Sequence, residues 1–302
     1  MTGRAPGALG ALADQLPARW RTRFAPAPTG WLHLGHAVSA LWVWGIARAF
    51  GGRVLLRVED HDAVRSRREY ERALFEDLEW LGFEPDELAP PQRDRGAAYE
   101  AALSPLEAAG MAYPCACSRR DIAGAVGDVF NEESRYPGSC RARALDPRLH
   151  RARRLRMGDG AETFEDLRLG VQSQEPAQQC GDVLVRDRSG RWTYQFAVAV
   201  DDRDQRIDLV IRGEDLLSST GRQLRLARLI GRAVPPRFLH HPLVLRPDGA
   251  KLSKSAGDSG LRELRAAGRS AAEVLGMAAH AAGLATDPRP VRADDVPALF
   301  RS

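Results

Sequence analysis

The fold is decided by a stretch near the N-terminus, RFAPAPTGWLHLGH, which covers residues 23–36. Residues 22–25 predict a short strand, which Pro26 ends. A helix is predicted over 35–50, because this segment is mostly apolar and contains no helix breaker except Gly45. A strand that leads through a proline-stiffened loop into a helix aims backbone N–H groups and the helix dipole above the sheet. The stretch therefore predicts an anion-binding site.

The segments that follow predict a doubly wound α/β fold with a Rossmann-like parallel sheet. Residues 53–58 form a near-continuous apolar run, which is typical of a buried parallel strand. Alternation of strands and helices favours helices on both faces of a parallel sheet. The further elements that the pattern predicts are helices at about 66–81, 95–110 and 219–231, and strands at 181–186, 194–200, 207–212 and 238–245.

The pattern is interrupted over 111–160, a segment rich in Cys, Arg, Gly and Pro, as an insertion would be. The predicted organisation has five parts: a flexible N-terminal extension over 1–20, the first half of the catalytic domain over 21–110, an insertion over 111–160, the second half over 161–255, and a short helical part over 256–302.

Composition indicates an ordinary globular protein of 302 residues, 44% hydrophobic and 28% charged. No apolar run approaches the roughly 18 residues of a membrane span. The apolar part of the N-terminal stretch is broken by Gly10 and Asp14, so we expect no leader, no membrane partner and a cytoplasmic monomer. The net charge of +4 is a weak indication of an anionic partner.

Two histidines lie at the start of the first predicted helix. His33 and His36 are three positions apart, so they share a face of the helix, and both can donate to phosphate oxygens. Gly35 removes a side chain where a flat ligand could lie against the backbone. Half of a zinc site, or two surface histidines, are the alternatives.

Both lysines of the chain lie within GAKLSKS, residues 249–255, whereas the other 42 basic residues are arginine. Lysine is a compact point charge on a flexible stem, so a charge that must swing onto a phosphate favours it over arginine. An accidental pairing of Lys251 and Lys254 in a surface loop is the alternative.

Together, HLGH and KLSKS resemble the two signature motifs of class I aminoacyl-tRNA synthetases. The motifs have the order of that family and bracket a split α/β domain. The resemblance implies that ATP binds with Mg²⁺ at His33, Gly35, His36 and Lys254. It also implies that the two histidines, Lys254 and Lys251 stabilise charge developing toward pyrophosphate.

RFAPAPTG, with RVEDHDAVRS after the second strand, is similar to the glutamyl/glutaminyl branch of that family. A carboxylate substrate suits the guanidiniums of Arg23 and Arg212, and its ammonium group needs an acid such as Glu59. Tyr194 could close the pocket. Surface ion pairs and a core aromatic are the alternatives for each residue taken alone.

Two positions depart from the pattern of the branch. The family commonly has Ser where this chain has Ala27, so one hydroxyl contact to the amino acid is missing or replaced. Leu216 falls where ordinary glutamyl-tRNA synthetases often carry an aromatic residue. The amino-acid pocket is therefore expected to include Ala27 and to differ in detail.

Only residues 256–302 follow the lysine motif, so no anticodon-reading domain is expected. In this the chain resembles the glutamyl-Q tRNA(Asp) synthetase family. That resemblance implies activation of L-glutamate without tRNA and its transfer to queuosine in the anticodon loop of tRNA(Asp). A truncated glutamyl-tRNA synthetase, or a non-catalytic nucleic-acid-binding paralogue, are the alternatives.

The insertion contains a candidate zinc site. Cys115, Cys117 and Cys140 can supply three thiolates of a tetrahedral site, and Tyr136 supplies an oxygen. The resemblance to glutamyl-Q enzymes implies one structural zinc ion at these four residues. Buried free cysteines are the alternative. Seven arginines between 141 and 156 form either a solvated face or a contact to a nucleic-acid backbone.

Overall fold

The computed structural model describes residues 16–126, 134–244 and 260–301. The strands are β1 Arg21–Phe24, β2 Arg53–Leu56, β3 Glu87–Leu88, β4 Ala112–Pro114, β5 Arg153–Leu155, β6 Glu162–Asp166, β7 Gly170–Gln174, β8 Val183–Arg186, β9 Leu209–Gly213 and β10 Arg237–His241. The helices are α2 Leu34–Ala49, α3 Arg68–Leu81, α4 Gly96–Ala108, α5 Arg119–Val126, α6 Pro176–Cys180, α7 Tyr194–Asp204, α8 Thr220–Leu229, α9 Leu261–Ala266 and α10 Ala271–Ala281, with 3₁₀ turns η2 Gln92–Asp94, η3 Glu214–Ser219 and η5 Ala293–Phe300.

A parallel sheet forms the centre of the molecule. β1, β2 and β3 pair in parallel, and so do β9 and β10. β1 and β9 lie side by side, and the backbone N–H of Asp208 donates to the carbonyl of Arg21 at 2.9 Å. The strand order β3-β2-β1-β9-β10 is that of a Rossmann-like sheet, in which ligands bind outside the carboxyl ends of the strands. The predicted α/β fold with a parallel sheet is confirmed.

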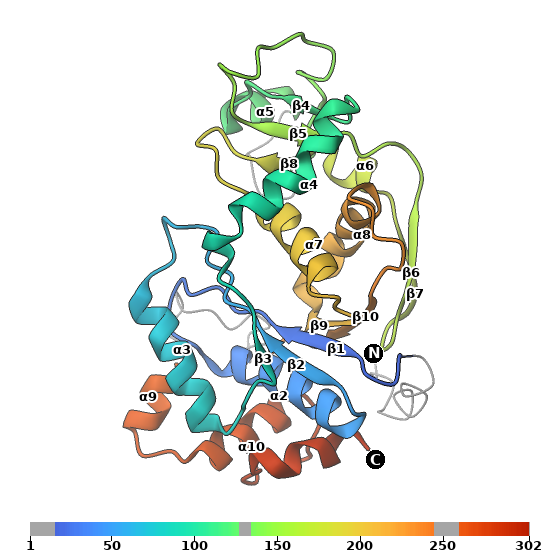
Figure 1. Ribbon diagram of the computed structural model, residues 1–302. Helices are drawn as coiled ribbons and strands as arrows, with labels where there is room; N and C mark the ends of the chain where they lie inside the picture. The colour runs from blue at the N-terminus through green and yellow to red at the C-terminus, as the bar shows by residue number, and fades with distance from the viewer. Residues whose placement is uncertain (1–15, 127–133, 245–259, 302) are drawn as a thin grey trace.

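Helices cover both faces of this sheet (Figure 1). α2 and α10 lie on one face, and α7 and α8 lie on the other. Side chains of β2 alternate accordingly: Val54 and Leu56 pack in the core that contains α2, whereas Leu55 packs with Phe164 and Val210 on the opposite side. This period of two is expected for a strand that is buried on both faces.

Helix α2 is buried along most of its length, and the glycine in its interior, Gly45, has a packing role. A Cβ atom at Gly45 would collide with the ring of Phe300 in η5. Trp42 contacts the same ring edge-on, with centroids 5.0 Å apart. The glycine therefore lets the chain's C-terminal turn lie directly against the helix that begins at the predicted anion site.

The prediction of a strand over 194–200 is wrong, because Tyr194–Asp204 forms helix α7. Every residue from Phe196 to Asp202 is buried, so the apolar run has no periodicity that separates a strand from a helix. The buried carboxylates Asp201 and Asp202 continue the helix beyond that run. Tyr194 consequently begins a helix and does not lie within a strand.

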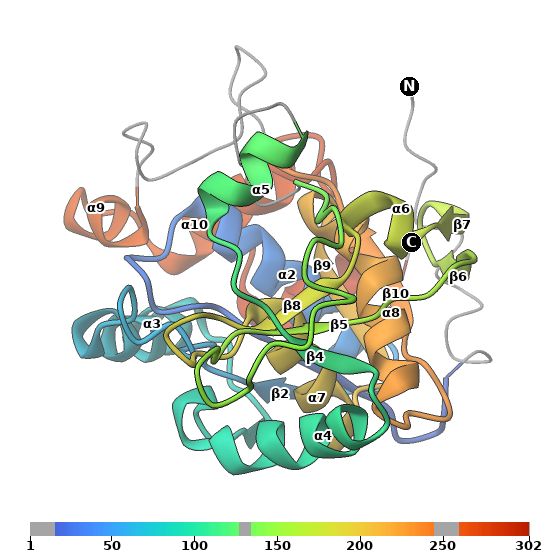
Figure 2. The same cartoon turned by 90° about the horizontal axis from the view of Figure 1, so that it is seen from above.

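The prediction that 181–186 contributes to the parallel sheet is also wrong. β8 pairs antiparallel with β5, which pairs antiparallel with β4, so these strands make a separate sheet. This sheet and α5 lie nearest the viewer in Figure 2. β6 and β7 form an antiparallel hairpin at the edge of β10. No described helix is long and apolar enough to cross a membrane.

Candidate active site

A cleft of about 1250 Å³ lies at the carboxyl ends of β1 and β9 and reaches the insertion at Cys117 and Arg154. This is the place where a sheet of this strand order binds ligands. The cleft brings together the predicted ATP-binding and glutamate-binding residues of the described chain: Arg23, Ala27, His33, Gly35, His36, Glu59, Tyr194 and Arg212.

The two histidines cap helix α2 reciprocally. Nδ1 of His33 accepts from the backbone N–H of Gly35 at 3.1 Å, and Nδ1 of His36 accepts from the backbone N–H of His33 at 3.2 Å. Their ring centroids lie 4.0 Å apart. Because each Nδ1 is an acceptor, each neutral ring carries its proton on Nε2 and can donate there. The pair thus has the tautomers that a phosphate oxygen requires.

Lys251 and Lys254 lie outside the described residues. The chain on either side of them is placed at the cleft: Val244 lines it, and Gly260 forms an isolated antiparallel bridge with His33. Val244 therefore lies at the cleft, and Gly260 lies beside the N-cap of α2.

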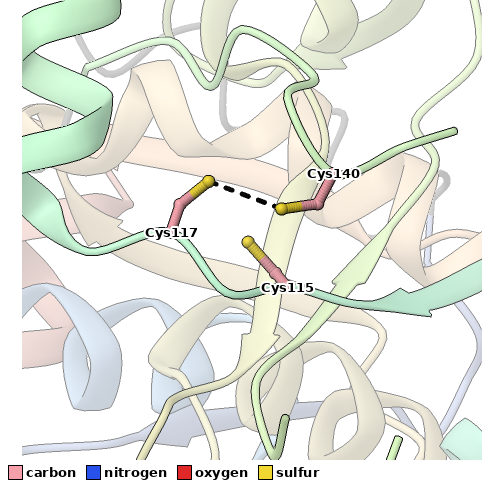
Figure 3. Close-up of side chains that lie close together, drawn as sticks. All are labelled: Cys115, Cys117 and Cys140. Carbon is pink, nitrogen blue, oxygen red and sulfur yellow. Dashed lines mark hydrogen bonds between the residues drawn. The ribbon is translucent and has the colours of Figure 1, made fainter. Parts of the chain in front are cut away.

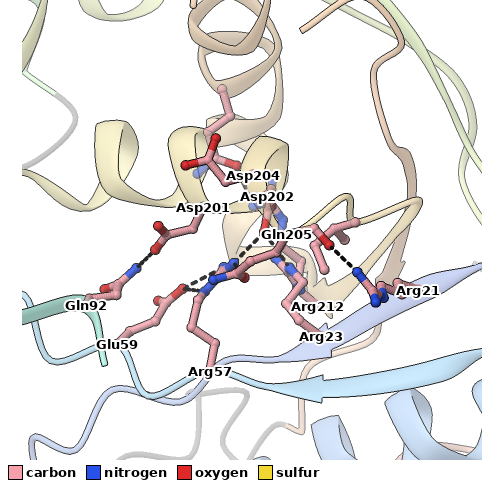
Figure 4. Close-up of polar contacts among 12 residues, drawn as sticks. Arg21, Arg23, Arg57, Glu59, Gln92, Asp201, Asp202, Asp204, Gln205 and Arg212 are labelled. Atoms are coloured by element: carbon pink, nitrogen blue, oxygen red, sulfur yellow. Dashed lines mark hydrogen bonds and ion pairs between the residues drawn. The ribbon is translucent and has the colours of Figure 1, made fainter. Parts of the chain in front are cut away.

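Buried charges from three strands and one helix meet beneath the cleft (Figure 4). Asp202 accepts from Arg57 at 2.7 Å and from Arg23 at 3.3 Å. Arg57 also donates to Glu59 at 3.0 Å, and its side chain is fully buried. Burial disfavours the ionised form of Asp202, but the guanidiniums of Arg23 and Arg57 outweigh it and hold its pKa below the ordinary value.

Arg212 is buried and has only neutral hydrogen-bond acceptors within the described chain. It donates to Nε2 of His240 at 3.0 Å, to Gln223 at 2.6 Å and to Thr220 at 2.8 Å. Since His240 accepts at Nε2, its Nδ1–H donates to Asp166 at 2.7 Å. Burial lowers the pKa of Arg212, and the nearby charge of Arg23 adds to this. Its positive charge therefore lacks a direct counter-ion.

Glu59 and Tyr194 complete this part of the cleft. Glu59 is 6% exposed, and burial raises its pKa against the opposing charges of Arg57 and Arg23. Burial also raises the pKa of Tyr194, and the charge of Glu59 adds to it, so the phenol stays protonated. A positive group bound beside Glu59 would favour its carboxylate form.

Both positions that depart from the family pattern lie at the cleft. Ala27 is exposed and lines it, at the position where the family commonly has a serine. Leu216 lies in η3 and is half-buried at the opposite wall.

Arg57, Asp202 and His240 were not among the predicted site residues. Arg57 interrupts the apolar run 53–58, and a charge within a buried run could have indicated a functional or paired arginine. The sequence gives no indication that Asp202 lies at the site, because the residues before it predict a strand and not the helix that carries it. His240 follows Phe238 and Leu239 in a strand. A histidine in that position is usually part of the core, so the sequence gives no reason to include it in the site.

The four candidate metal ligands lie together in the insertion, and Figure 3 shows the three cysteines among them. Sγ atoms of Cys115, Cys117 and Cys140 all lie within 4.8 Å of one another. Sγ of Cys117 is 3.5 Å from that of Cys140, and the hydroxyl oxygen of Tyr136 is 3.6 Å from Sγ of Cys115 and 3.8 Å from Sγ of Cys117. Tetrahedral zinc, with about 2.3 Å to sulfur and about 2.0 Å to oxygen, separates its ligand atoms by roughly 3.5–3.8 Å. The donor set therefore fits zinc.

Four arginines of the 141–156 run have structural partners. Arg141 pairs with the buried carboxylate of Asp182 at 2.7 Å, and Arg153 pairs with Glu107. Arg154 lies over the ring of Tyr136 at 3.6 Å, and Arg156 donates to backbone carbonyls. These side chains stabilise the insertion. The exposed members of the run that remain for a partner are Arg143, Arg148 and Arg151.

Comparison with known proteins identifies the family. The sequence model of the catalytic domain of class I tRNA synthetases (E and Q) matches residues 19–268. The chain is 45% identical to glutamyl-Q tRNA(Asp) synthetase of Burkholderia mallei over 80% of this chain and 83% of that protein. It is 42% identical to glutamyl-Q tRNA(Asp) synthetase of Symbiobacterium thermophilum over 92% of this chain and 91% of that protein.

Among solved structures, the fold is similar to a glutamate tRNA ligase from Elizabethkingia meningosepticum in complex with its amino acid, with a TM-score of 0.77 and 28% identity. The match covers 93% of this chain but only 65% of that ligase, so the chain spans slightly less than two thirds of its length. The chain belongs to the family of class I tRNA synthetases for E and Q, and it is a ligase-type enzyme similar to the glutamyl-Q tRNA(Asp) synthetases.

Proposed function

We propose that this enzyme activates L-glutamate with ATP to glutamyl-adenylate without tRNA, and transfers the glutamyl group to queuosine in the anticodon loop of tRNA(Asp). The names of its relatives support the acceptor, and the charges of the cleft support the amino acid.

The observation that carries the proposal is an imbalance of buried charge. Among the described residues of this group, the buried guanidiniums of Arg23, Arg57 and Arg212 face the buried carboxylates of Glu59 and Asp202. The neighbouring buried carboxylate of Asp201 is paired with Arg95 at 2.5 Å and does not alter this balance. Glutamate has two carboxylates and one ammonium group at neutral pH, so its net charge is −1. Binding of glutamate would therefore neutralise the excess positive charge of this group.

The arrangement also supports how glutamate would be oriented. A carboxylate can accept from Arg212, whose own acceptors are neutral. It can also accept from Arg23, which donates to Asp202 and to the carbonyl of Ile211 as well. Arg57 donates to one oxygen of Glu59, which leaves the second oxygen for the substrate ammonium. Glutamine, which lacks the side-chain charge, would leave the excess charge uncompensated.

We place the phosphates of ATP, with Mg²⁺, at the start of α2. His33 and His36 would donate through Nε2, and the open backbone at Gly35 would lie against the nucleotide. In the activation step a carboxylate oxygen of glutamate attacks the α-phosphorus of ATP, and pyrophosphate leaves. Lys254, assisted by Lys251, would stabilise the charge that develops on the leaving group.

We assign Cys115, Cys117, Tyr136 and Cys140 to one structural zinc ion. When bound, zinc would cross-link two segments of the insertion, because two ligands come from 115–117 and two from 136–140. Cys117 also lines the cleft, so loss of structure in the insertion would alter the wall of the cleft that an anticodon loop would contact.

The test is to locate the product ester. The enzyme should incorporate labelled glutamate into tRNA(Asp) that carries queuosine and not into the same tRNA with guanosine at that position. Nuclease digestion should place the label in the anticodon fragment, and removal of the terminal adenosine should not change it. Label at the 3′ end would instead establish a truncated glutamyl-tRNA synthetase, and the absence of glutamate-dependent ATP–pyrophosphate exchange would establish a non-catalytic paralogue.

A further inference from the structure

Asp201 is a buried carboxylate on α7 that faces three donors. It accepts from Nε2 of Gln92 at 2.7 Å, from the hydroxyl of Tyr99 at 3.0 Å and from Nε of Arg95 at 2.5 Å. Figure 4 shows Gln92 pointing at Asp201 from the segment beside Glu59. Because an ionised carboxylate only accepts, the nitrogen of the Gln92 amide must face it.

The orientation of Gln92 determines the protonation of His61. Gln92 is 1% exposed, and its Oε1 lies 2.6 Å from Nδ1 of His61. An amide oxygen only accepts, so Nδ1 of His61 carries a proton and donates it. In the neutral ring Nε2 is then an acceptor. The chain from Asp201 through Gln92 therefore fixes one tautomer of His61.

His61 lies beside the groups assigned to the substrate ammonium. It lines the cleft, and its ring centroid is 6.4 Å from that of Tyr194. It follows Glu59 by two residues, and the backbone N–H of Glu59 donates to the carbonyl of Pro26 at 3.1 Å. This bond joins the segment of His61 to the loop of the anion site. An acceptor nitrogen, a carboxylate and a phenol thus border one part of the cleft.

We propose that His61 is a binding residue for the ammonium group of the substrate amino acid, which donates to Nε2. Gln92 and Asp201 are the positioning residues that hold the ring in the accepting tautomer. The proposal rests on the proposed function in one respect, that the cleft binds glutamate. An ammonium group has three N–H donors, so it can bind Glu59 and His61 together.

Calorimetric titration with glutamate and with glutarate, which is glutamate without its amino group, tests this role. His61→Phe keeps an aromatic ring and removes the acceptor. We expect it to weaken glutamate binding about 10–100-fold, the range for one hydrogen bond to a charged group. Glutarate should bind the variant and the wild-type enzyme equally well, because it has no ammonium group. His280→Phe, on the exposed side of α10, is the matched control and should change neither affinity.

Gln92→Met tests the positioning chain, because it keeps the size of the side chain and removes both hydrogen bonds. It should weaken glutamate binding several-fold and leave glutarate binding unchanged. In ATP–pyrophosphate exchange, His61→Phe and Gln92→Met should each raise KM for glutamate and leave kcat within about twofold, as expected for a ground-state contact.

Equal losses for glutamate and glutarate in His61→Phe would indicate a structural role and overturn the proposal. Unchanged glutamate binding in that variant would also overturn it. A wild-type enzyme that binds glutarate as tightly as glutamate would overturn it as well. Failure of transfer to queuosine with intact glutamate binding would reject the proposed acceptor and leave the role of His61 standing.

Discussion

His33 and Gly260 form an isolated antiparallel bridge, and the backbone N–H of Leu261 donates to the carbonyl of Leu32 at 2.9 Å. His33 is also the N-cap of α2. The chain that leaves the second motif is therefore fixed to the first residue of the first motif. This contact fixes the described chain that begins at Gly260 to the start of α2, where we propose that the phosphates of ATP bind.

Lys254→Ala should lower the rate of glutamate-dependent ATP–pyrophosphate exchange by about 10²–10³, the scale of losing one transition-state donor. Lys254→Arg should also be impaired, because a planar guanidinium does not replace a mobile point charge. Glutamate affinity, measured by calorimetry, should stay within about twofold in both variants, since we assign glutamate binding to Arg23, Glu59 and Arg212 and not to Lys254. Wild-type exchange activity in the arginine variant would show that the choice of lysine is incidental.

Arg212→Gln should weaken glutamate binding by about 10–100-fold, because a charge-assisted hydrogen bond is lost. Binding of ATP should be unchanged, and it serves as the internal control. The variant should also lose its preference for glutamate over glutamine in competition binding, since the excess positive charge is removed. Retained preference would mean that Arg23 alone selects the side-chain carboxylate.

The sequence alone predicted the parallel sheet and most of the cleft for a physical reason. Residues such as Arg212 and Glu59 lie at or just beyond strand ends, and carboxyl ends of parallel strands meet at one edge of a sheet. The position of a residue at the end of a predicted strand was therefore enough to predict that it lies near residues that are distant in the sequence. The lysines were equally visible in sequence, but they lie outside the described residues.

The parts that could not be predicted depend on side-chain contacts between distant segments. Arg57 meets Asp202, 145 positions away, and nothing in either neighbourhood specifies that pairing. The sequence over 194–200 predicts a strand although it forms helix α7, because a run of residues that are all buried shows neither the helical nor the strand period of hydrophobic residues. The chain from Asp201 to His61 became visible only when that segment was placed as a helix.

Cys117→Ser should lose most of the bound zinc and lower the melting temperature, because a thiolate at the centre of the cluster is replaced by a weak ligand. Elemental analysis of the purified protein gives the metal content. Cys180→Ser is the matched control, since Cys180 is buried in α6 and donates to the carbonyl of Pro176 outside the cluster. Wild-type protein without zinc, or equal metal content in both variants, would contradict the assignment.

Asp77 on α3 predicts a dependence of stability on pH. Burial raises the pKa of its carboxyl to about 6, against the opposing charge of Arg265. A folded-state pKa above the unfolded value of about 3.9 means that the protonated form favours folding. This stabilisation is full below about pH 4 and is lost as pH rises through 6.

Asp77→Asn should therefore raise the free energy of unfolding at pH 7.5 by about 1–2 kcal/mol, after allowance for partial solvent access. Its unfolding free energy should also vary less between pH 4 and 6.5 than that of the wild type. Glu76→Gln, an exposed position on the same helix, is the control and should stay within about 0.5 kcal/mol. Chemical denaturation at several pH values provides the measurement, and equal effects of both substitutions would reject the role of burial.

Replacing Arg143, Arg148 and Arg151 together by serine should weaken tRNA(Asp) binding and leave the fold intact, because these side chains are exposed. Each phosphate contact to a single-stranded segment contributes about 0.7 to the slope of log affinity against log salt, so the slope should fall by about 2 if all three bind phosphates. Arg141→Ser is the contrasting variant: it breaks the pair with buried Asp182, so it should lower the melting temperature more than it changes the slope. Filter binding over a salt series measures the slope. An unchanged slope in the triple variant would show that the run does not contact tRNA, and the anticodon loop would then have to be held by other walls of the cleft.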